Sequence, residues 1–216
     1  MRPFDIDAQQ LKNNLLSMGA LVEKQIVNAH QALMESDKNL AYTVIQNDAK
    51  VNDMDLELDE EALRILALHT PTARDLRSIT TAMKITTELE RISDLAENVC
   101  ERVIELADEP QLKPYIDITR MAESSNRMVK NALQAFISED VKLARQVRDD
   151  DDFVDQLIEQ VFRELLSFML EEPQSITRGI RIMFVAKYFE RIADHATNIA
   201  ELVVYLVEGT IIRHTT

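Results

Sequence analysis

A twelve-residue segment occurs twice in this chain, one hundred residues apart. The segments are ERISDLAENVCE, residues 90–101, and ERIADHATNIAE, residues 190–201, and they agree at seven positions. A series of matches at a spacing of 103 residues extends upstream, from the pair Met18 and Met121 to the pair Val51 and Val154. A collinear series of this length indicates an internal duplication. Two copies are too few for an open solenoid, so we expect two similar domains or one pseudo-symmetric domain.

The composition predicts helix nearly everywhere. The chain has only three Gly and five Pro in 216 residues, and its abundant Leu, Ala, Glu, Arg and Met favour helix. The apolar residues follow the helical period between the prolines. Polar residues at Ser36-Asp37 and Ser138-Glu139 predict two further turns with N-cap oxygens. The predicted helices are 7–35, 38–69, 72–108, 115–137, 140–171 and 175–208.

These helices predict an all-α fold of two tandem, pseudo-symmetric three-helix bundles. The first bundle would occupy residues 1–110 and the second residues 111–216. Aromatic residues make up 5% of the chain and Trp is absent. We therefore expect both cores to consist mainly of Leu, Ile, Val and Met.

The charge balance excludes several classes of partner. The chain has 24 basic and 38 acidic residues, a net charge of −14, whereas nucleic acid and anionic lipid both require a basic face. The most apolar stretch, residues 202–207, is too short to span a bilayer, and the N-terminus lacks a signal-peptide profile. The single Cys100 permits no internal disulfide, and we expect it to be a small buried residue rather than a nucleophile. These features predict a cytoplasmic protein without membrane insertion.

The repeated segment places oxygen-bearing side chains on one face of each helix. Steps of four, eight and eleven residues rotate by roughly 40°, 80° and 20° beyond whole turns. The residues on this face are Glu90, Asp94, Asn98 and Glu101 in the first copy and Glu190, Asp194, Asn198 and Glu201 in the second.

The preceding helix in each copy offers matching residues at the same height. Asp48 lies 23 positions before Pro71 and Asp94 lies 23 after it, and antiparallel helices rise equally per residue. The same calculation around Pro173 applies to the second copy. It predicts two facing groups: Asp48 and Asn52 with Glu90 and Asp94, and Asp151 and Asp155 with Glu190 and Asp194.

Carboxylates that converge without a cation repel one another, and their pKa values rise. A hard or borderline divalent or trivalent cation would relieve this repulsion. The alternative is a solvated acidic face in which Arg91 and Arg191 pair locally with Asp94 and Asp194. The duplication and the matched heights favour metal sites. Asn52 stands where the second copy has Asp155, so we expect the first site to bind metal more weakly or to hold fewer ions.

Enzymatic functions have little support in the sequence. A ferritin-like di-iron site needs Glu-x-x-His pairs, and none of the four His here has Glu three residues before it. The isolated Gly residues form no phosphate cradle, and no catalytic triad is evident. The main rival to a metal-binding regulator is a metal-free helical adapter. In an adapter, Arg74, Asp75 and Arg77 would matter more than Glu90 or Glu190.

The paired segments at 90–101 and 190–201, the ARDLR segment at 73–77 and the Asp-rich segment at 150–155 resemble the PhoU family along essentially the whole chain. The resemblance implies E(D)-x-x-x-D motifs that bind metal ions, of which iron, manganese, zinc and magnesium are candidates. It also implies a non-enzymatic regulator that restrains phosphate-starvation signalling. The partners so implied are the ATPase component of a phosphate ABC transporter, a sensor histidine kinase and a second copy of the chain. The location so implied is the cytoplasm or the inner face of the plasma membrane.

Overall fold

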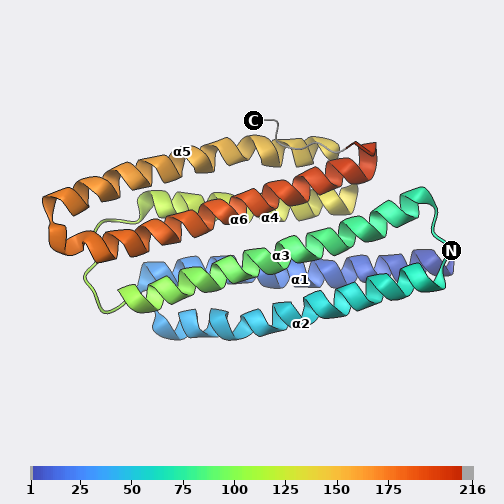
Figure 1. The fold of residues 1–216 in the computed structure, drawn as a ribbon, viewed down its shortest axis with the longest axis horizontal. Helices are drawn as coiled ribbons and strands as arrows, with labels where there is room; N and C mark the ends of the chain where they lie inside the picture. The colour runs from blue at the N-terminus through green and yellow to red at the C-terminus, as the bar shows by residue number, and fades with distance from the viewer. Residues whose placement is uncertain (1, 211–216) are drawn as a thin grey trace.

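The computed structural model describes residues 2–210 of the chain, and six long helices make up nearly all of this part (Figure 1). The first three are α1 (Pro3–Glu35), α2 (Lys38–Leu68) and α3 (Ala73–Leu106). The second three are α4 (Ile116–Ser138), α5 (Val141–Glu171) and α6 (Ile176–Glu208), with a 3-10 turn, η1 (Pro173–Ser175), before α6. The predicted all-α class and helix order are confirmed, with ends that differ from the prediction by a few residues.

The turns between α1 and α2 and between α4 and α5 have the same conformation. Ser36 and Glu139, 103 residues apart, both adopt a left-handed backbone, with φ of 52° and 51°. The next residue caps the following helix: Asp37 accepts hydrogen bonds from the backbone N–H groups of Asn39 and Leu40, and Asp140 accepts them from those of Lys142 and Leu143. The N-cap of α5 is therefore Asp140 rather than the predicted Ser138-Glu139 pair, because Ser138 still belongs to α4.

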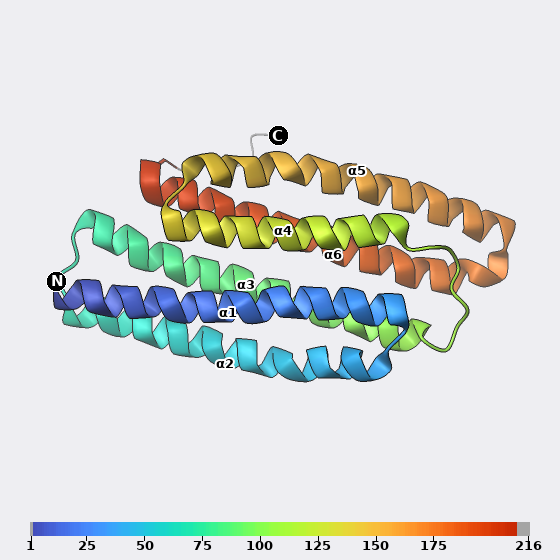
Figure 2. The ribbon, with the colours of Figure 1, turned by 180° about the vertical axis from the view of Figure 1, so that it is seen from behind.

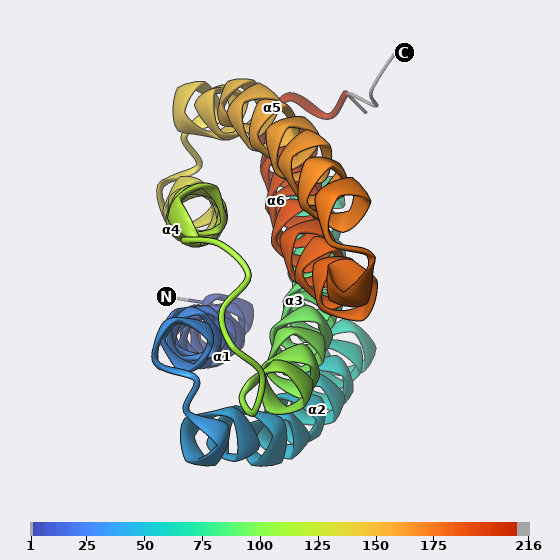
Figure 3. The same ribbon diagram turned by 90° about the vertical axis from the view of Figure 1, so that its left-hand side faces the viewer.

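The two copies pack as antiparallel halves around one core. Figure 1 shows α3 and α6 running side by side in opposite directions, and Figure 2 shows α1 beside α4 on the other face. In the view along the long axis of the molecule in Figure 3, α5 lies at one edge and α2 at the opposite edge. Helix α2 packs on α1 and α3, and α5 packs on α4 and α6. Four central helices therefore carry the contact between the copies.

The buried apolar side chains of all six helices form one continuous cluster. Its largest fully buried members include Phe189, Leu15, Met18, Ile26 and Met121. Gly19 permits the close approach of α1 to α4, because a Cβ atom there would lie 2.5 Å from Leu133 Cδ1. Among the described residues, no helix combines the length and the apolar character needed to cross a membrane.

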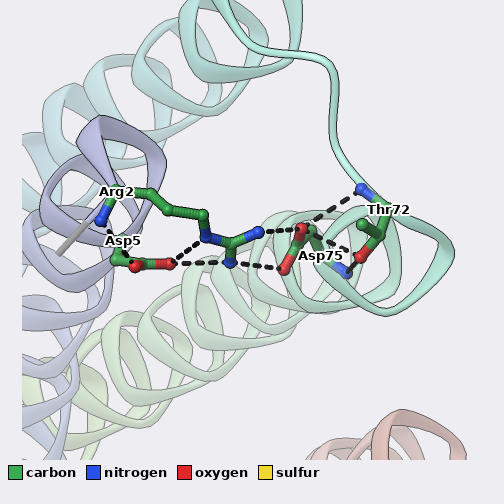
Figure 4. A network of polar contacts seen from close by, with 4 residues as sticks. All are labelled: Arg2, Asp5, Thr72 and Asp75. Atoms are coloured by element: carbon green, nitrogen blue, oxygen red, sulfur yellow. Dashed lines mark hydrogen bonds and ion pairs between the residues drawn. The ribbon is translucent and has the colours of Figure 1, made fainter.

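Polar contacts fasten the N-terminus to the start of α3 (Figure 4). The Arg2 guanidinium lies 2.7 Å from Asp5 Oδ1 and 3.2 Å from Asp75 Oδ2. Asp75 also accepts a hydrogen bond from the backbone N–H of Thr72, and Thr72 Oγ1 accepts one from the N–H of Asp75. This reciprocal pair is a capping box, which satisfies donors that the first turn of a helix leaves free.

Candidate metal centres

The first copy brings three carboxyl groups together between α2 and α3. Asp48, Asp94 and Glu97 can each offer one oxygen atom such that these atoms all lie within 4.8 Å of one another. Asp48 is buried, and the other two are partly buried. Burial is the largest cause that raises the pKa of both Asp94 and Glu97, and the negative charge of Asp48 is the second. Among residues 2–210, this is the one group of three acids that is close enough to hold a metal ion.

Asp48 is held by neutral hydrogen-bond donors. Ser93 Oγ lies 2.6 Å from Asp48 Oδ1, and Asn52 Nδ2 donates to Asp48 Oδ2 over 2.9 Å. Asn52 therefore orients the Asp48 carboxylate through its amide nitrogen. Its amide oxygen is not used in this hydrogen bond and could still bind a cation.

The remaining predicted residues of the first copy border this cluster. Burial, followed by the charge of Asp94, raises the pKa of Glu90. Arg91 lies 3.3 Å from Glu90 and 3.5 Å from Asp94, which is the local pairing considered as an alternative to metal binding. Asn98 Nδ2 donates to the backbone carbonyl of Asp94 over 2.7 Å, so the Asn98 side chain folds along its own helix.

In the second copy, acids surround Asp151, which is 8% exposed. Among the described residues they do not bring three carboxyl oxygen atoms within 4.8 Å of one another, as the first copy does. Burial raises the pKa of Asp151 to about 7, with the charges of Asp194, Asp155 and Glu190 as further causes. The pKa of Asp194 is also raised, first by desolvation of its carboxyl group and then by the charge of Glu190, although Asp194 is an exposed residue. A buried carboxyl group among like charges is a position that a cation would stabilise.

Glu190 has one satisfied and one unsatisfied oxygen. Lys187 Nζ donates to Glu190 Oε1 over 2.6 Å, whereas Glu190 Oε2 is buried and has no hydrogen-bond partner. A buried carboxylate oxygen without a partner is costly, and it fits a bound cation. The second copy thus offers an unpaired oxygen of the type that metal ions coordinate.

Asn198 forms a hydrogen bond with a residue of the first copy. Its Nδ2 donates to Glu88 Oε2 over 3.0 Å, and His195 Nδ1 lies 2.6 Å from the same oxygen. Both residues lie on α6, and Glu88 lies on α3. The Asn198 amide nitrogen therefore joins the two copies.

Glu97 was not among the predicted residues. Its position in the second copy is Thr197, so a search for acids shared by both copies passes over it. The signal was nevertheless present, because Glu97 lies seven residues after Glu90, a step that returns to within roughly 20° of the same face. With Glu97 included, the first copy has as many carboxylates as the second: Asp48, Glu90, Asp94 and Glu97 against Asp151, Asp155, Glu190 and Asp194.

Both groups consist of oxygen donors, which suit magnesium, manganese, iron and, through carboxylates, zinc. A cation would replace carboxylate repulsion with attraction, and it would link α2 to α3 in the first copy and α5 to α6 in the second. The arrangement suits the binding of ions and the fastening of helices.

Comparison with known proteins identifies the family. The model of the PhoU domain matches this chain twice, over residues 15–103 and 118–203. The chain belongs to the PhoU family. The two matches coincide with the two copies of the duplication, which confirms the resemblance seen in the repeated segments.

Relatives and solved structures agree with this assignment. The chain is 40% identical to the phosphate-specific transport system accessory protein PhoU homolog of Pseudomonas putida, over 98% of this chain and 83% of that protein. It is 41% identical to the homolog of Aquifex aeolicus, over 96% of this chain and 94% of that protein. The crystal structure of PhoU from Pseudomonas aeruginosa superposes with a TM-score of 0.93 at 41% identity, covering 96% of this chain and all (100%) of that one. The crystal structure of the phosphate transport system regulatory protein PhoU from Streptococcus pneumoniae gives a TM-score of 0.92 at 28% identity, covering 97% of this chain and 99% of that one.

Proposed function

We propose that this chain is a negative regulator of phosphate uptake and of phosphate-starvation signalling. It would act between the ATPase component of a phosphate ABC transporter and a sensor histidine kinase, in the cytoplasm or at the inner face of the plasma membrane. The observation that carries this proposal is the match along nearly the whole chain to proteins named as accessory proteins of phosphate-specific transport. The all-helical fold, shared with solved structures of PhoU proteins, supports a binding role.

The regulatory proposal can be tested in a bacterium that lacks its own PhoU protein. A phosphate-starvation reporter should be active in phosphate-rich medium in this strain, and expression of the present chain should silence it. Affinity capture with the transporter ATPase component and with the kinase, each supplied as a purified protein, tests the two partners separately. A reporter that stays active despite normal expression of the chain would contradict the proposal.

We further propose that the two acidic groups bind iron, manganese, zinc or magnesium. In the first copy the ligands would be Asp48, Asp94 and Glu97, with Glu90 and Asn52 beside them. In the second copy they would be Asp151, Asp155, Glu190 and Asp194. The convergence of carboxyl groups with raised pKa values supports this proposal, as does the unpaired oxygen of Glu190.

Elemental analysis tests metal binding directly. The protein is purified without chelators or metal-affinity resin, beside a variant that carries Glu190→Ala and Asp194→Ala. A stoichiometric amount of metal that falls in the variant is the expected result. Protein that lacks metal and also fails to take up added Mn²⁺ or Fe²⁺ would favour the rival function.

The rival function is a metal-free adapter whose acidic faces are docking surfaces. The start of α3 offers the specific support, because Arg74 and Arg77 stand on either side of Asp75 in the sequence, and Asp75 contacts Arg2 (Figure 4). Arg74 is exposed and lies 2.8 Å from Glu139 of the second copy. If the adapter function is correct, a chelator leaves partner binding unchanged, while Arg74→Ala weakens it.

We also propose that the chain forms a homodimer. Large apolar side chains remain exposed on the single chain, among them Leu170 at 75% and Leu68 at 66%. A contiguous group of such side chains would be typical of an interaction site, whereas scattered ones are normal on a protein surface. Sedimentation velocity over a range of concentrations measures the oligomeric state, and a monomer at every concentration would contradict this point.

A further inference from the structure

Two buried polar side chains connect Asp48 on α2 to helix α1. Ser93 Oγ on α3 lies 2.6 Å from Asp48 Oδ1 and 2.6 Å from Gln25 Oε1 on α1. Ser93 is 0% exposed and Gln25 is 2% exposed. Side chains buried this deeply need hydrogen-bond partners within the protein.

The number of protons fixes the direction of these hydrogen bonds. A serine hydroxyl has one proton, so Ser93 cannot donate to Asp48 and to Gln25 together. The Gln25 Nε2 group is buried and has no partner. Exchange of the amide oxygen and nitrogen, which are nearly indistinguishable by shape, resolves both conflicts: Gln25 Nε2 donates to Ser93 Oγ, and Ser93 donates its proton to Asp48 Oδ1. The amide oxygen is then left unpaired, and an unpaired acceptor is better tolerated than an unpaired donor.

The second copy folds in the same way without this pair. Met128 occupies the position of Gln25 at the spacing of 103, and Ala193 occupies the position of Ser93 at the spacing of 100. Both are fully buried. Apolar side chains therefore fill these positions in an equivalent helix bundle, and packing alone does not explain why the first copy has a polar pair there.

We propose that Gln25 and Ser93 are positioning residues that hold the Asp48 carboxylate in one orientation for the cation of the first copy. This inference rests on the proposed metal binding and deepens it, because it assigns the two copies different ways of presenting a buried aspartate. Asp48 is fixed in advance by a donor chain that begins on α1. Met128 and Ala193 cannot form such a chain to Asp151, on which the negative charges of neighbouring acids act.

The expected effect follows from how ligating carboxylates behave in metal sites. A hydrogen bond to the ligand removes rotational freedom that the metal would otherwise have to restrict. Loss of such supporting partners typically weakens metal affinity about 10–100-fold. Asp48 also accepts from Asn52, so loss of Ser93 should weaken the site rather than abolish it.

The test uses Mn²⁺ and a full-length protein in which only the first copy can bind. Glu190→Gln with Asp194→Asn disables the second copy and serves as the reference protein. The free-ion signal in electron paramagnetic resonance then reports the dissociation constant for Mn²⁺. In this background we expect Ser93→Ala to raise the dissociation constant about 10–100-fold.

Ser125→Ala is the matched control. Ser125 is also 0% exposed, but its hydroxyl donates to the carbonyl of Ala122 in its own helix. Its removal should leave the dissociation constant unchanged. The thermal midpoint of the metal-free protein is measured for both variants, because a merely structural Ser93 would lower this midpoint without changing Mn²⁺ affinity.

Gln25→Met, which introduces the residue of the second copy, tests whether Gln25 acts on Asp48 through Ser93. Since Gln25 acts through Ser93, the change should weaken Mn²⁺ binding in the reference protein and add little once Ser93→Ala is present. It also provides an independent measurement if Ser93→Ala does not fold. Unchanged dissociation constants in both variants would overturn the positioning role while leaving the metal site in place. Failure of the unmodified protein to take up Mn²⁺ would overturn the metal proposal itself, and the positioning role with it.

Discussion

His195 on α6 contacts Glu88 on α3 across the boundary between the two copies, with 2.6 Å between His195 Nδ1 and Glu88 Oε2. Asn198 donates to the same carboxylate oxygen. The His195 side chain is 17% exposed and the Glu88 side chain is 23% exposed, so both are partly buried. One carboxylate therefore joins two polar side chains of the other copy.

Glu88→Ala should destabilise the protein by about 1–3 kcal/mol, because it leaves two partly buried polar groups without their acceptor. Urea denaturation monitored by helical circular dichroism measures the free energy of unfolding. Glu60→Ala is the control, since Glu60 is an exposed residue of α2. Equal effects of the two changes would mean that the contact between Glu88 and His195 contributes nothing specific.

Asp151→Asn and Asp48→Asn should have opposite effects on the metal-free protein at pH 7.5. Asp151 is buried among like charges, so loss of its charge should raise the thermal midpoint in the presence of a chelator. Asp48 accepts hydrogen bonds from Ser93 and Asn52 on its two oxygen atoms. An amide in its place keeps one acceptor and puts its NH2 group against the other donor, so the midpoint should fall. Each change should reduce the stabilisation that added Mn²⁺ gives. Differential scanning fluorimetry with and without Mn²⁺ measures both effects.

Glu164→Gln should make the stability of the protein less dependent on acidic pH. The hydrogen bond from the buried Lys113 ammonium is the largest cause that lowers the pKa of Glu164, and Gln160 adds a second. A lowered pKa in the folded state stabilises the protein above the ordinary carboxyl pKa, and this contribution is lost as pH falls through the folded value. Unfolding midpoints measured between pH 3 and pH 7 should fall more steeply for the wild type than for Glu164→Gln.

The matched control for Glu164→Gln is Glu159→Gln on the same helix. Glu159 is exposed, and its partner Arg163 lies 3.8 Å away. Its replacement should leave the pH profile as in the wild type. At neutral pH, Glu164→Gln alone should lower stability, because Lys113 would remain buried without a counter-charge.

Cys100 should be inert in the native protein. It is fully buried, as the sequence predicted. Burial, with the charge of Glu97 as a second cause, raises the pKa of its thiol to about 12. Because the thiolate is the reactive form, Ellman's reagent at pH 8 should give no reaction until denaturant is added. Rapid modification of the folded protein would show that α3 opens locally near Cys100.

The fold was predictable from the sequence because periodicity, prolines and the duplication agree. A composition rich in helix-forming residues predicted the all-α fold class. The duplication allowed each turn to be located independently in both copies. The N-cap at Asp140 was predicted one or two residues too early, because Ser138 and Glu139 are also polar. The left-handed backbone at Glu139, which ends α4, leaves no mark in the sequence.

The candidate site was less predictable than the fold. Asp48 and Asp94 are equally distant from Pro71 along the chain, and this correctly predicted that they lie close together, because the rise per residue is the same in both helices. The predicted role of Asn98 stays a prediction: its Nδ2 donates to the backbone carbonyl of Asp94, a contact that the sequence pattern does not predict. Ser93 and Gln25 could not be found by comparing the copies, because the second copy has apolar residues at both positions. Their role depends on a three-helix contact that only the structure supplies.

The shared core has a consequence for the origin of such a chain. Helices α1 and α3 cover their apolar faces with α4 and α6 of the other copy. A half-length ancestor with one copy would have exposed this face, and two identical half-length chains could have covered it by associating with each other. Joining the halves into one gene removed the need for both to stay the same. One half could then acquire Gln25, Ser93 and Glu97 while the other kept or gained Met128, Ala193 and Thr197.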